Sequence, residues 1–301
     1  MNNKIFIGID IGGTKISIVF FKNYKIIKKL KLATNPIDSP TKNKPELIAE
    51  NILKSIDGYK NNVFEIGIAT TGIINNGKWS VLNRQILGEF YNFPLTNYIQ
   101  DKLKVPVFAF SDTEAAALAE FEFGAGKKLS NFFYITVSTG VGGSMVIENK
   151  LYSKSPNLAG AFGHMVIAQN GKLCGCGRRG CIEAYASGTA IDKILKQSKY
   201  KDLTTKDMLL NYNKAAWSKK IIEEVSKYLA EGVVNVNSLL GIDQFIIGGS
   251  IGLNSIVFDE IKKQTKLISK EKIKFKKAKL KNDAEVFGCL AKSSIHKLSV
   301  N

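Results

Sequence analysis

The first twenty residues alternate apolar side chains around a pair of glycines, and this pattern limits which elements can form there. In the stretch IFIGIDIGGTKISIVFF (residues 5–21), isoleucine occupies every second position up to Gly12 and Gly13, and the alternation resumes after them. A period of two predicts a β-strand, a glycine turn and a second strand. A P-loop and a dinucleotide-binding turn are both disfavoured, because each needs a helix directly after its glycines.

The same design recurs about 130 residues later. The stretch NFFYITVSTGVGGSMVIENKLY (residues 131–152) gives an apolar strand, a glycine turn over Thr139–Gly143 and a second apolar strand. Each copy is followed by mixed helical and strand patterns, so we expect two related α/β domains with a ligand cleft between them. The predicted domains are residues 1–115 and 116–283, with a C-terminal helix over about 284–301 packing back on the first.

The two glycine turns are candidates for binding phosphate. Each combines a threonine hydroxyl with exposed backbone amides, which are the groups that hold phosphate oxygens in such turns. The alternative is an ordinary tight hairpin, since any hairpin turn favours glycine. Gly248 and Gly249, in a GGS stretch after the apolar strand DQFII, form a third candidate for close approach of the backbone to a ligand.

Three of the four cysteines and one of the two histidines lie within residues 160–181. His164, Cys174, Cys176 and Cys181 supply one imidazole and three thiols, which is enough to close a tetrahedral zinc shell. The alternative is a set of buried reduced thiols, but so many glycines and basic residues in between argue against a core strand or helix. Because the protein fills all four positions, we expect the zinc to be structural.

Asp112 follows the apolar stretch VPVFAF and precedes a predicted helix from Thr113 to about Phe123. Ser111 and Glu114 have the spacing of a capping box, and a carboxylate in the first turn suits the helix dipole, so a purely structural role explains Asp112 well. Its place at the carboxyl end of a strand, beside the expected cleft, keeps it a candidate catalytic residue.

The formal net charge of +17 raises the question of a nucleic-acid or membrane partner. Only three of the 43 basic residues are arginine, and the lysines are spread along the whole chain, whereas base readout favours the arginine fork. We therefore expect a solvated lysine-rich surface and no nucleic-acid partner. No apolar run has the length of a membrane span or the form of a leader, which predicts a cytoplasmic protein.

Taken together, five stretches of the chain resemble the ROK family of sugar kinases and sugar-responsive repressors. They are DIGGTK, SDTEAAALAEFEFGAG, STGVGG, GAFGHMVIAQNGKLCGCGRRGCIEAYASG and IIGGS. The resemblance covers essentially the whole chain, and the cysteine-rich segment is its most specific part. It implies an actin-like ATPase fold with ATP and Mg²⁺ in the cleft, a structural Zn²⁺, and a homodimer.

The resemblance also implies roles for individual residues. Asp112 matches the catalytic base, and His164, Cys174, Cys176 and Cys181 match the metal ligands. The residues that match ATP and phosphate contacts are Asp10, Gly12, Gly13, Thr14, Lys15, Thr139, Gly140, Gly142, Gly143, Gly248 and Gly249. The residues that match sugar contacts are Gly72, Asn83, Ser111, Asp112, His164 and Glu183.

Within the family, residues 70–95 and the stretch ITVSTGVGG resemble the bacterial N-acetylmannosamine kinases. This implies ATP-dependent phosphorylation of the 6-hydroxyl of N-acetylmannosamine, in sialic acid catabolism. Ser111 replaces the usual asparagine, and Ala161 stands where many members have a sugar-binding glutamate and some have histidine. A glucokinase or fructokinase of the same family is the alternative enzyme, and a non-catalytic sugar-binding regulator is the alternative of another class.

Overall fold

The computed structural model describes residues 4–34, 44–82, 87–152 and 158–293. The chain divides into two compact units. The first comprises Met1–Glu122, Ser153–Leu158 and Asn282–Asn301, and the second comprises Phe123–Tyr152 and Ala159–Lys281. Of the residues singled out in the sequence, Asn83 lies outside the described part, as does the end of the predicted C-terminal helix.

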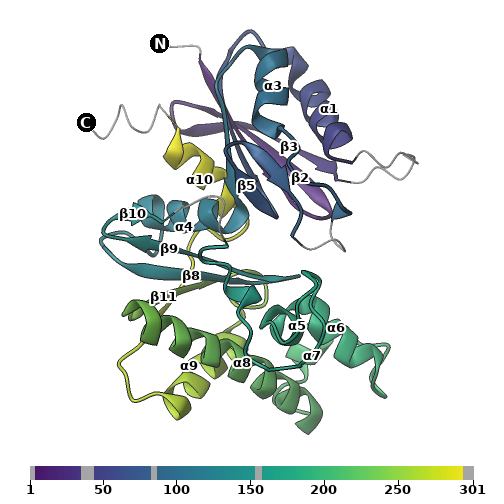
Figure 1. The fold of residues 1–301 in the computed structure, drawn as a ribbon, viewed down its shortest axis with the longest axis vertical. Coiled ribbons are helices and arrows are strands. Elements are labelled where there is room, and N and C mark those ends of the chain that lie inside the picture. Colours follow the sequence, from purple (N-terminus) through teal and green to yellow (C-terminus); the bar gives the residue numbers. More distant parts are fainter. Residues whose placement is uncertain (1–3, 35–43, 83–86, 153–157, 294–301) are drawn as a thin grey trace. The chain divides into compact units, whose positions relative to one another are not determined.

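The first unit is built on a five-stranded sheet with the order β3-β2-β1-β4-β7 (Figure 1). Its strands are β1 (Ile5–Ile11), β2 (Lys15–Lys22), β3 (Lys25–Ala33), β4 (Val63–Thr70) and β7 (Val107–Ser111). The hairpins β1–β2 and β2–β3 are antiparallel, whereas β4 pairs with β1 and β7 in parallel. A short hairpin of β5 (Ile73–Asn75) and β6 (Lys78–Ser80) completes the strands of this unit.

Helices cover both faces of this first sheet. The isoleucines at odd positions of β1 pack in one core with α1 (Lys44–Ile56) and α3 (Leu95–Leu103). Phe6 faces the other way and packs with α4 (Asp112–Phe123) and α10 (Ala284–Lys292) in a second core. Because side chains alternate along a strand, Asp10 projects to the face that carries α4 and α10. The two-residue period thus decides where this carboxyl lies.

The second unit repeats the sheet of the first. Its strand order is β10-β9-β8-β11-β12, in which β8–β9 and β9–β10 are antiparallel and β8–β11 and β11–β12 are parallel. The strands are β8 (Phe132–Val137), β9 (Val141–Ile147), β10 (Lys150–Leu151), β11 (Gln244–Gly248) and β12 (Lys274–Lys277). The order and directions match those of the first sheet strand for strand, which confirms the prediction that the chain contains two related halves.

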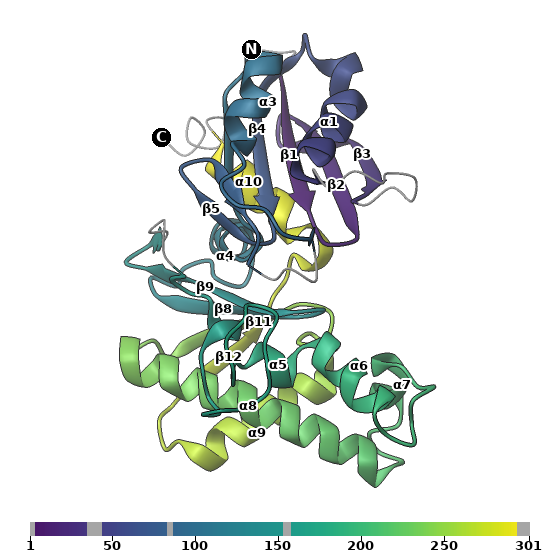
Figure 2. The ribbon, with the colours of Figure 1, turned by 45° about the vertical axis from the view of Figure 1, so that its right-hand side comes forward.

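Two long helices form the main layer against the second sheet. Figure 2 shows α8 (Ala216–Leu240) and α9 (Ser255–Ile268) side by side along it. Buried residues of α8 recur three or four apart, as Ile222, Val225, Leu229 and Val233 do, so one helix face meets the core. The helix ends at Gly241, which takes a left-handed φ of 66°. The remaining helices of this unit are α5 (Glu183–Ala186), α6 (Gly188–Lys196) and α7 (Thr205–Leu210).

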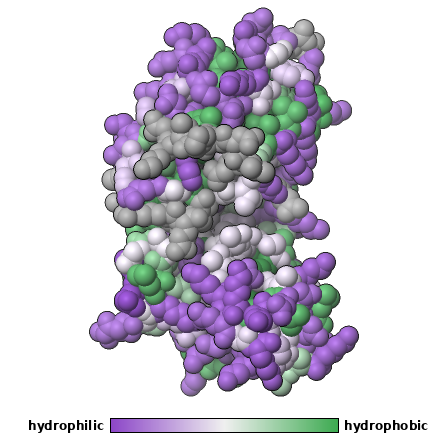
Figure 3. Space-filling model, turned by 90° about the vertical axis from the view of Figure 1, so that its right-hand side faces the viewer, coloured by the Kyte–Doolittle hydropathy of each residue, from purple (hydrophilic) through white to green (hydrophobic). Residues whose placement is uncertain are grey.

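The surface agrees with the lysine-rich composition. The face of the molecule in Figure 3 carries mostly hydrophilic side chains, with apolar groups in small patches. Strand β12, within the lysine-rich stretch 270–281, alternates exposed lysines with partly buried residues, and its Phe275 packs against the core of the second unit. Among the described helices, none has both the length and the apolar character that crossing a membrane would require.

Candidate active site and metal centre

The first glycine turn is a tight hairpin. Residues 12–14 join β1 directly to β2, and the amide of Gly12 donates to the carbonyl of Lys15 at 3.0 Å. The hydroxyl of Thr34 donates to the carbonyl of Gly12 at 2.8 Å and holds the turn from β3. The strand–turn–strand prediction is therefore confirmed, and the turn's remaining amides do not belong to a helix terminus.

Three carboxyl groups of the first unit interact with one another. Asp10 comes from β1, Asp112 from the first residue of α4 and Glu285 from the first turn of α10. Burial, and then the charge of Asp112, raises the pKa of Asp10 to about 7, although Lys15 opposes this. Burial, and then the charge of Asp10, raises the pKa of Glu285 to about 8. Carboxyls whose pKa values are raised by burial and by one another's charge are common at catalytic sites.

Asp112 is held at the junction of β7 and α4. Its Oδ1 accepts a hydrogen bond from the amide of Thr113 at 2.7 Å. The capping box is present beside it, since the amide of Ser111 donates to Glu114 Oε2 at 2.9 Å and the amide of Glu114 donates to Ser111 Oγ at 3.3 Å. Ser111 and Glu114 thus cap the helix, which leaves Asp112 less important for capping than its position in the sequence suggests.

The second glycine turn is shorter than predicted. Ser138, Thr139 and Gly140 connect β8 to β9, whereas Gly142 and Gly143 lie within β9 and pair with β8. The amide of Ser138 donates to the carbonyl of Gly140 at 2.9 Å. A Cβ at Gly143 would lie 2.7 Å from the ring of Phe133 and 2.8 Å from Phe162, so this glycine is required by packing.

Gly248 ends β11, the parallel strand beside β8, and Gly249 follows it. Gly249 has a φ of +80°, and a Cβ there would lie 2.3 Å from the carbonyl of Val137 at the end of β8. That carbonyl accepts the amides of Ile251 and Gly252 at 3.0 and 3.1 Å. The third glycine turn is therefore packed against the strand that leads into the second one.

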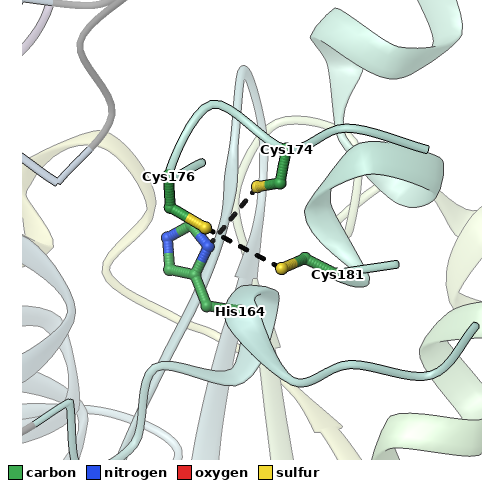
Figure 4. A group of neighbouring side chains, drawn as sticks. All are labelled: His164, Cys174, Cys176 and Cys181. Carbon is green, nitrogen blue, oxygen red and sulfur yellow. Dashed lines mark hydrogen bonds between the residues drawn. The ribbon is translucent and has the colours of Figure 1, made fainter. Parts of the chain in front are cut away.

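The metal candidates converge as the sequence predicted (Figure 4). One ligand atom each from His164, Cys174, Cys176 and Cys181 lies within 4.8 Å of every other. The Nδ1 of His164 is 3.6 Å from Cys174 Sγ, and Cys176 Sγ is 3.8 Å from Cys181 Sγ. His164 ends a 3₁₀ turn over Phe162–His164, and the cysteines lie in the glycine-rich loop that follows it.

The electrostatics around this cluster favour a neutral imidazole. Burial lowers the pKa of His164, which opposes the positive form and suits a metal ligand. Burial raises the pKa of Cys174 and of Cys181. Burial has the same effect on Cys176, but hydrogen bonds from Arg178 and with the thiols of Cys174 and Cys181 together outweigh it and lower the pKa of that thiol. Arg178 also donates from Nη2 to the carbonyl of His164 at 2.9 Å.

Glu183 lies between this cluster and the second glycine turn. It is the first residue of α5, and its Oε2 accepts the amide of Val141 at 3.1 Å. Its Oε1 is 3.9 Å from Cys174 Sγ. Glu183 is only two residues after Cys181 in the sequence, but its hydrogen bond with the amide of Val141 could not be predicted from that spacing.

Gly72, a candidate sugar contact, has a structural explanation as well. Gly72 has a φ of +106°, and a Cβ there would lie 2.4 Å from the carbonyl of Ser80. Glycine is thus required at that position whether or not a sugar binds there. The sequence analysis missed Glu285, whose signal was weak: it is one of two acidic residues, with Asp283, before the apolar run VFGCLA.

Comparison with known proteins places this geometry in a family. The profile of the ROK family matches residues 6–293. An N-acetylmannosamine kinase of Haemophilus influenzae (strain PittEE) is 36% identical over 249 residues, which cover 82% of this chain and 81% of that protein. The chain therefore belongs to the ROK family.

Solved structures agree with this assignment. The ROK family glucokinase of Streptomyces griseus, in complex with glucose and AMPPNP, has a TM-score of 0.78 and 28% identity, covering 95% of this chain and 97% of that one. A ROK family transcriptional regulator, a homolog of the E. coli MLC protein, has a TM-score of 0.82 and 22% identity, covering 96% of this chain and 77% of that one. The fold is the actin-like ATPase fold that the sequence predicted.

Proposed function

We propose that this protein is an ATP-dependent sugar kinase that phosphorylates the 6-hydroxyl of N-acetylmannosamine. Its class, a carbohydrate kinase, follows from the ROK family and its kinase members. The observation that carries the choice of sugar is the 36% identity to an N-acetylmannosamine kinase over most of both chains. The geometry of the site supports phosphoryl transfer, and the choice of sugar rests on the sequence similarity alone.

Asp112 is the proposed catalytic base. Its carboxyl takes the proton of the acceptor hydroxyl as the new O–P bond forms, and the γ-phosphoryl group leaves ADP. The charge of Asp112 helps to raise the pKa of Asp10 and of Glu285, so Asp112 lies beside carboxyls with perturbed pKa values, as catalytic residues often do. Mg²⁺, when bound with ATP, supplies positive charge to the phosphates.

The glycine turns are the proposed phosphate-binding elements. In the first unit the contacts come from Asp10, Gly12, Gly13, Thr14 and Lys15. In the second unit they come from Thr139, Gly140, Gly142, Gly143, Gly248 and Gly249. Because Gly142 and Gly143 lie within β9, only Thr139 and Gly140 among these four residues of the second glycine turn have a turn backbone to offer. Exposed turn amides and a hydroxyl suit phosphate oxygens.

The sugar is proposed to be held by Glu183 and His164, with Ser111, Asn83 and Gly72 as further contacts. A carboxylate accepts hydrogen bonds from sugar hydroxyls, and serine can donate or accept one despite its short side chain. Ala161 has no polar side chain for the sugar, so Glu183 and His164 carry more of the recognition.

The four-residue cluster fits zinc. Tetrahedral bonds of about 2.3 Å to sulfur and about 2.05 Å to nitrogen imply sulfur–sulfur separations of about 3.8 Å and sulfur–nitrogen separations of about 3.6 Å. The observed pairs are 3.8 and 3.6 Å apart. Soft thiolates and an imidazole are also donors that suit zinc. With all four positions filled by protein, the zinc would hold the loop and orient the ring of His164.

The test is ATP consumption with a panel of sugars. N-acetylmannosamine should have the highest kcat/KM, above glucose and fructose, and the product should carry phosphate on its 6-hydroxyl. Glucose as the best substrate would make this a ROK glucokinase. The likeness to a ROK regulator gives the other alternative, and a protein that binds sugar but consumes no ATP with any of them would favour it. A cytoplasmic location, a homodimer and a role in sialic acid catabolism stay predictions.

A further inference from the structure

Glu183 connects the second glycine turn to the metal cluster. All of these residues belong to the second unit. One carboxylate oxygen accepts the backbone amide of Val141 at 3.1 Å, and the other is 3.9 Å from the sulfur of Cys174. A single side chain therefore contacts the turn proposed to bind phosphate and a ligand of the proposed zinc.

The turn is shaped to receive this carboxylate. A Cβ on Gly140 would lie 2.8 Å from Glu183 Oε2, so a larger residue there would push the carboxylate out of its present position. The bond to Val141 uses the first amide after the turn and so fixes the direction in which the preceding peptide units point. Turn amides bind phosphate only when they converge on it, so their direction matters for nucleotide affinity.

The backbone gives a route from the metal ligands to Glu183. Val166 and Cys181 form a β-bridge, and the amide of Ile182 donates to the carbonyl of Met165 at 3.0 Å. Met165 follows the ligand His164, and Ile182 follows the ligand Cys181. An ion that holds His164 and Cys181 together therefore clamps the short bridge from which Glu183 projects.

Residues that follow Glu183 also form hydrogen bonds with the second glycine turn. The amide of Gly188 donates to the carbonyl of Ser138 at 2.8 Å. The amide and the hydroxyl of Thr189 both donate to the carbonyl of Thr139, at 3.1 and 3.0 Å. Residues 183–189 thus contact Ser138 and Thr139 in the turn and Val141 directly after it, and among these contacts that of Glu183 comes from a side chain that also lies beside a metal candidate.

We propose that Glu183 is a positioning residue for the second glycine turn, through which occupancy of the metal site sets the affinity of the protein for adenine nucleotide. The inference rests on the proposed function, since it takes this turn as the phosphate site. Coupling between two binding sites is reciprocal, so nucleotide must tighten metal binding by the same factor by which metal tightens nucleotide binding.

The experiment measures ADP affinity by calorimetry in the absence of sugar, on zinc-loaded and on chelator-treated protein. Metal removal should weaken ADP binding about fivefold or more in the unaltered chain. In Glu183→Ala this dependence on metal should largely disappear. In Glu183→Gln it should persist, because the amide oxygen can still accept the amide of Val141. Coupling that survives in the alanine variant, or is lost in both variants alike, overturns the proposal.

A second readout uses reciprocity and follows the release of zinc to a chelator. ADP should slow this release in the unaltered protein and in Glu183→Gln, and should not slow it in Glu183→Ala. Arg179→Met is the matched control within the metal segment, because the Arg179 side chain bonds the carbonyl of Gly171 rather than Glu183, and it should keep the effect of ADP. An unchanged release rate in the unaltered protein contradicts the proposal, even if the alanine variant fails to fold.

A third variant separates coupling from general support of the turn. Thr189→Val removes the hydroxyl bond to Thr139 without touching the cluster, so it should weaken ADP binding by a similar factor with and without zinc. If ADP affinity no longer depended on zinc in Thr189→Val, the coupling would not be specific to Glu183. Neither readout contains sugar, so failure to phosphorylate N-acetylmannosamine would leave this test intact, and a failed coupling would leave the kinase assignment intact.

Discussion

Asp112 is the residue on which the proposed chemistry depends most directly. Asp112→Asn keeps the shape of the side chain and the oxygen that accepts the amide of Thr113, but it cannot take a proton. We expect kcat to fall roughly a hundredfold or more. Stability should be nearly unchanged, since Ser111 and Glu114 supply the cap. Steady-state kinetics and thermal unfolding measure both, and near-normal turnover would remove Asp112 from the mechanism.

Glu285 gives a prediction about pH at the same scale. Burial and the charges of Asp10, Asp112 and Asp283 raise its pKa from 4.5 to about 8, while Lys29 pairs with Asp283 nearby. A carboxyl with a raised pKa in the folded state stabilises the fold below its unfolded pKa, and this contribution is lost as the pH rises toward 8.

Glu285→Gln cannot ionise, so it should not lose stability in this way. Between about pH 5.5 and about pH 9, the melting temperature of the unaltered protein should fall further than that of the variant, by at least about 2 °C. Differential scanning fluorimetry across that range measures the difference. Parallel pH curves for the two proteins would show that Glu285 titrates normally.

At the scale of elements, the metal segment makes the sharpest prediction. Metal analysis of the purified protein should give about one zinc per chain, and Cys176→Ser should lose it together with thermal stability. Cys289→Ala is the matched control, because this fully buried cysteine of α10 lies outside the metal cluster, in a hydrophobic core of the first unit. The control should keep its zinc despite a loss of stability. If the purified protein contained no zinc and were fully active, the proposed metal site would be wrong.

The glycine turns give a second prediction at this scale. Gly249 and Gly241 both have positive φ, of 80° and 66°, but a Cβ would meet the carbonyl of Val137 at Gly249 and nothing within 4 Å at Gly241. Gly241→Ala should therefore cost about 1–2 kcal/mol of unfolding free energy from backbone conformation alone. Gly249→Ala should cost clearly more, because the third turn must also move from β8. Urea unfolding compares the two, and equal losses would mean that the close approach is unimportant.

Local pattern explains which elements could be predicted. The alternation of residues 5–21 and 131–152 determines strands by itself, so these strands could be predicted. Cys174, Cys176 and Cys181 are close in sequence, so the metal candidates could be predicted as well. The bonds of Glu183 to Val141 and of Thr189 to Thr139 join residues far apart in the chain, and no local period encodes them. Glu285 meets Asp10 for the same reason, since α10 returns to β1 only in the folded chain.

At the scale of the whole molecule, the proposed choice of sugar turns on Ala161, a position at which this chain departs from the family pattern that it resembles. Ala161 is partly buried at the start of the turn Phe162–His164, and its carbonyl accepts the amide of His164 at 2.9 Å. A new side chain there would project from the turn that carries His164, without replacing any existing polar contact of the Ala161 side chain.

Ala161→His should therefore tighten N-acetylmannosamine binding or leave it unchanged. One added hydrogen bond is worth on the order of 1 kcal/mol, which is at most about tenfold in affinity. Glu183→Ala should be far more harmful, because it removes a carboxylate that the proposed site depends on. The measurement is kcat/KM for N-acetylmannosamine, glucose and fructose with saturating ATP on all three proteins. If Glu183→Ala retains the sugar preference and affinity of the unaltered chain, Glu183 is no sugar ligand, and its bond to Val141 is then the role that remains for it.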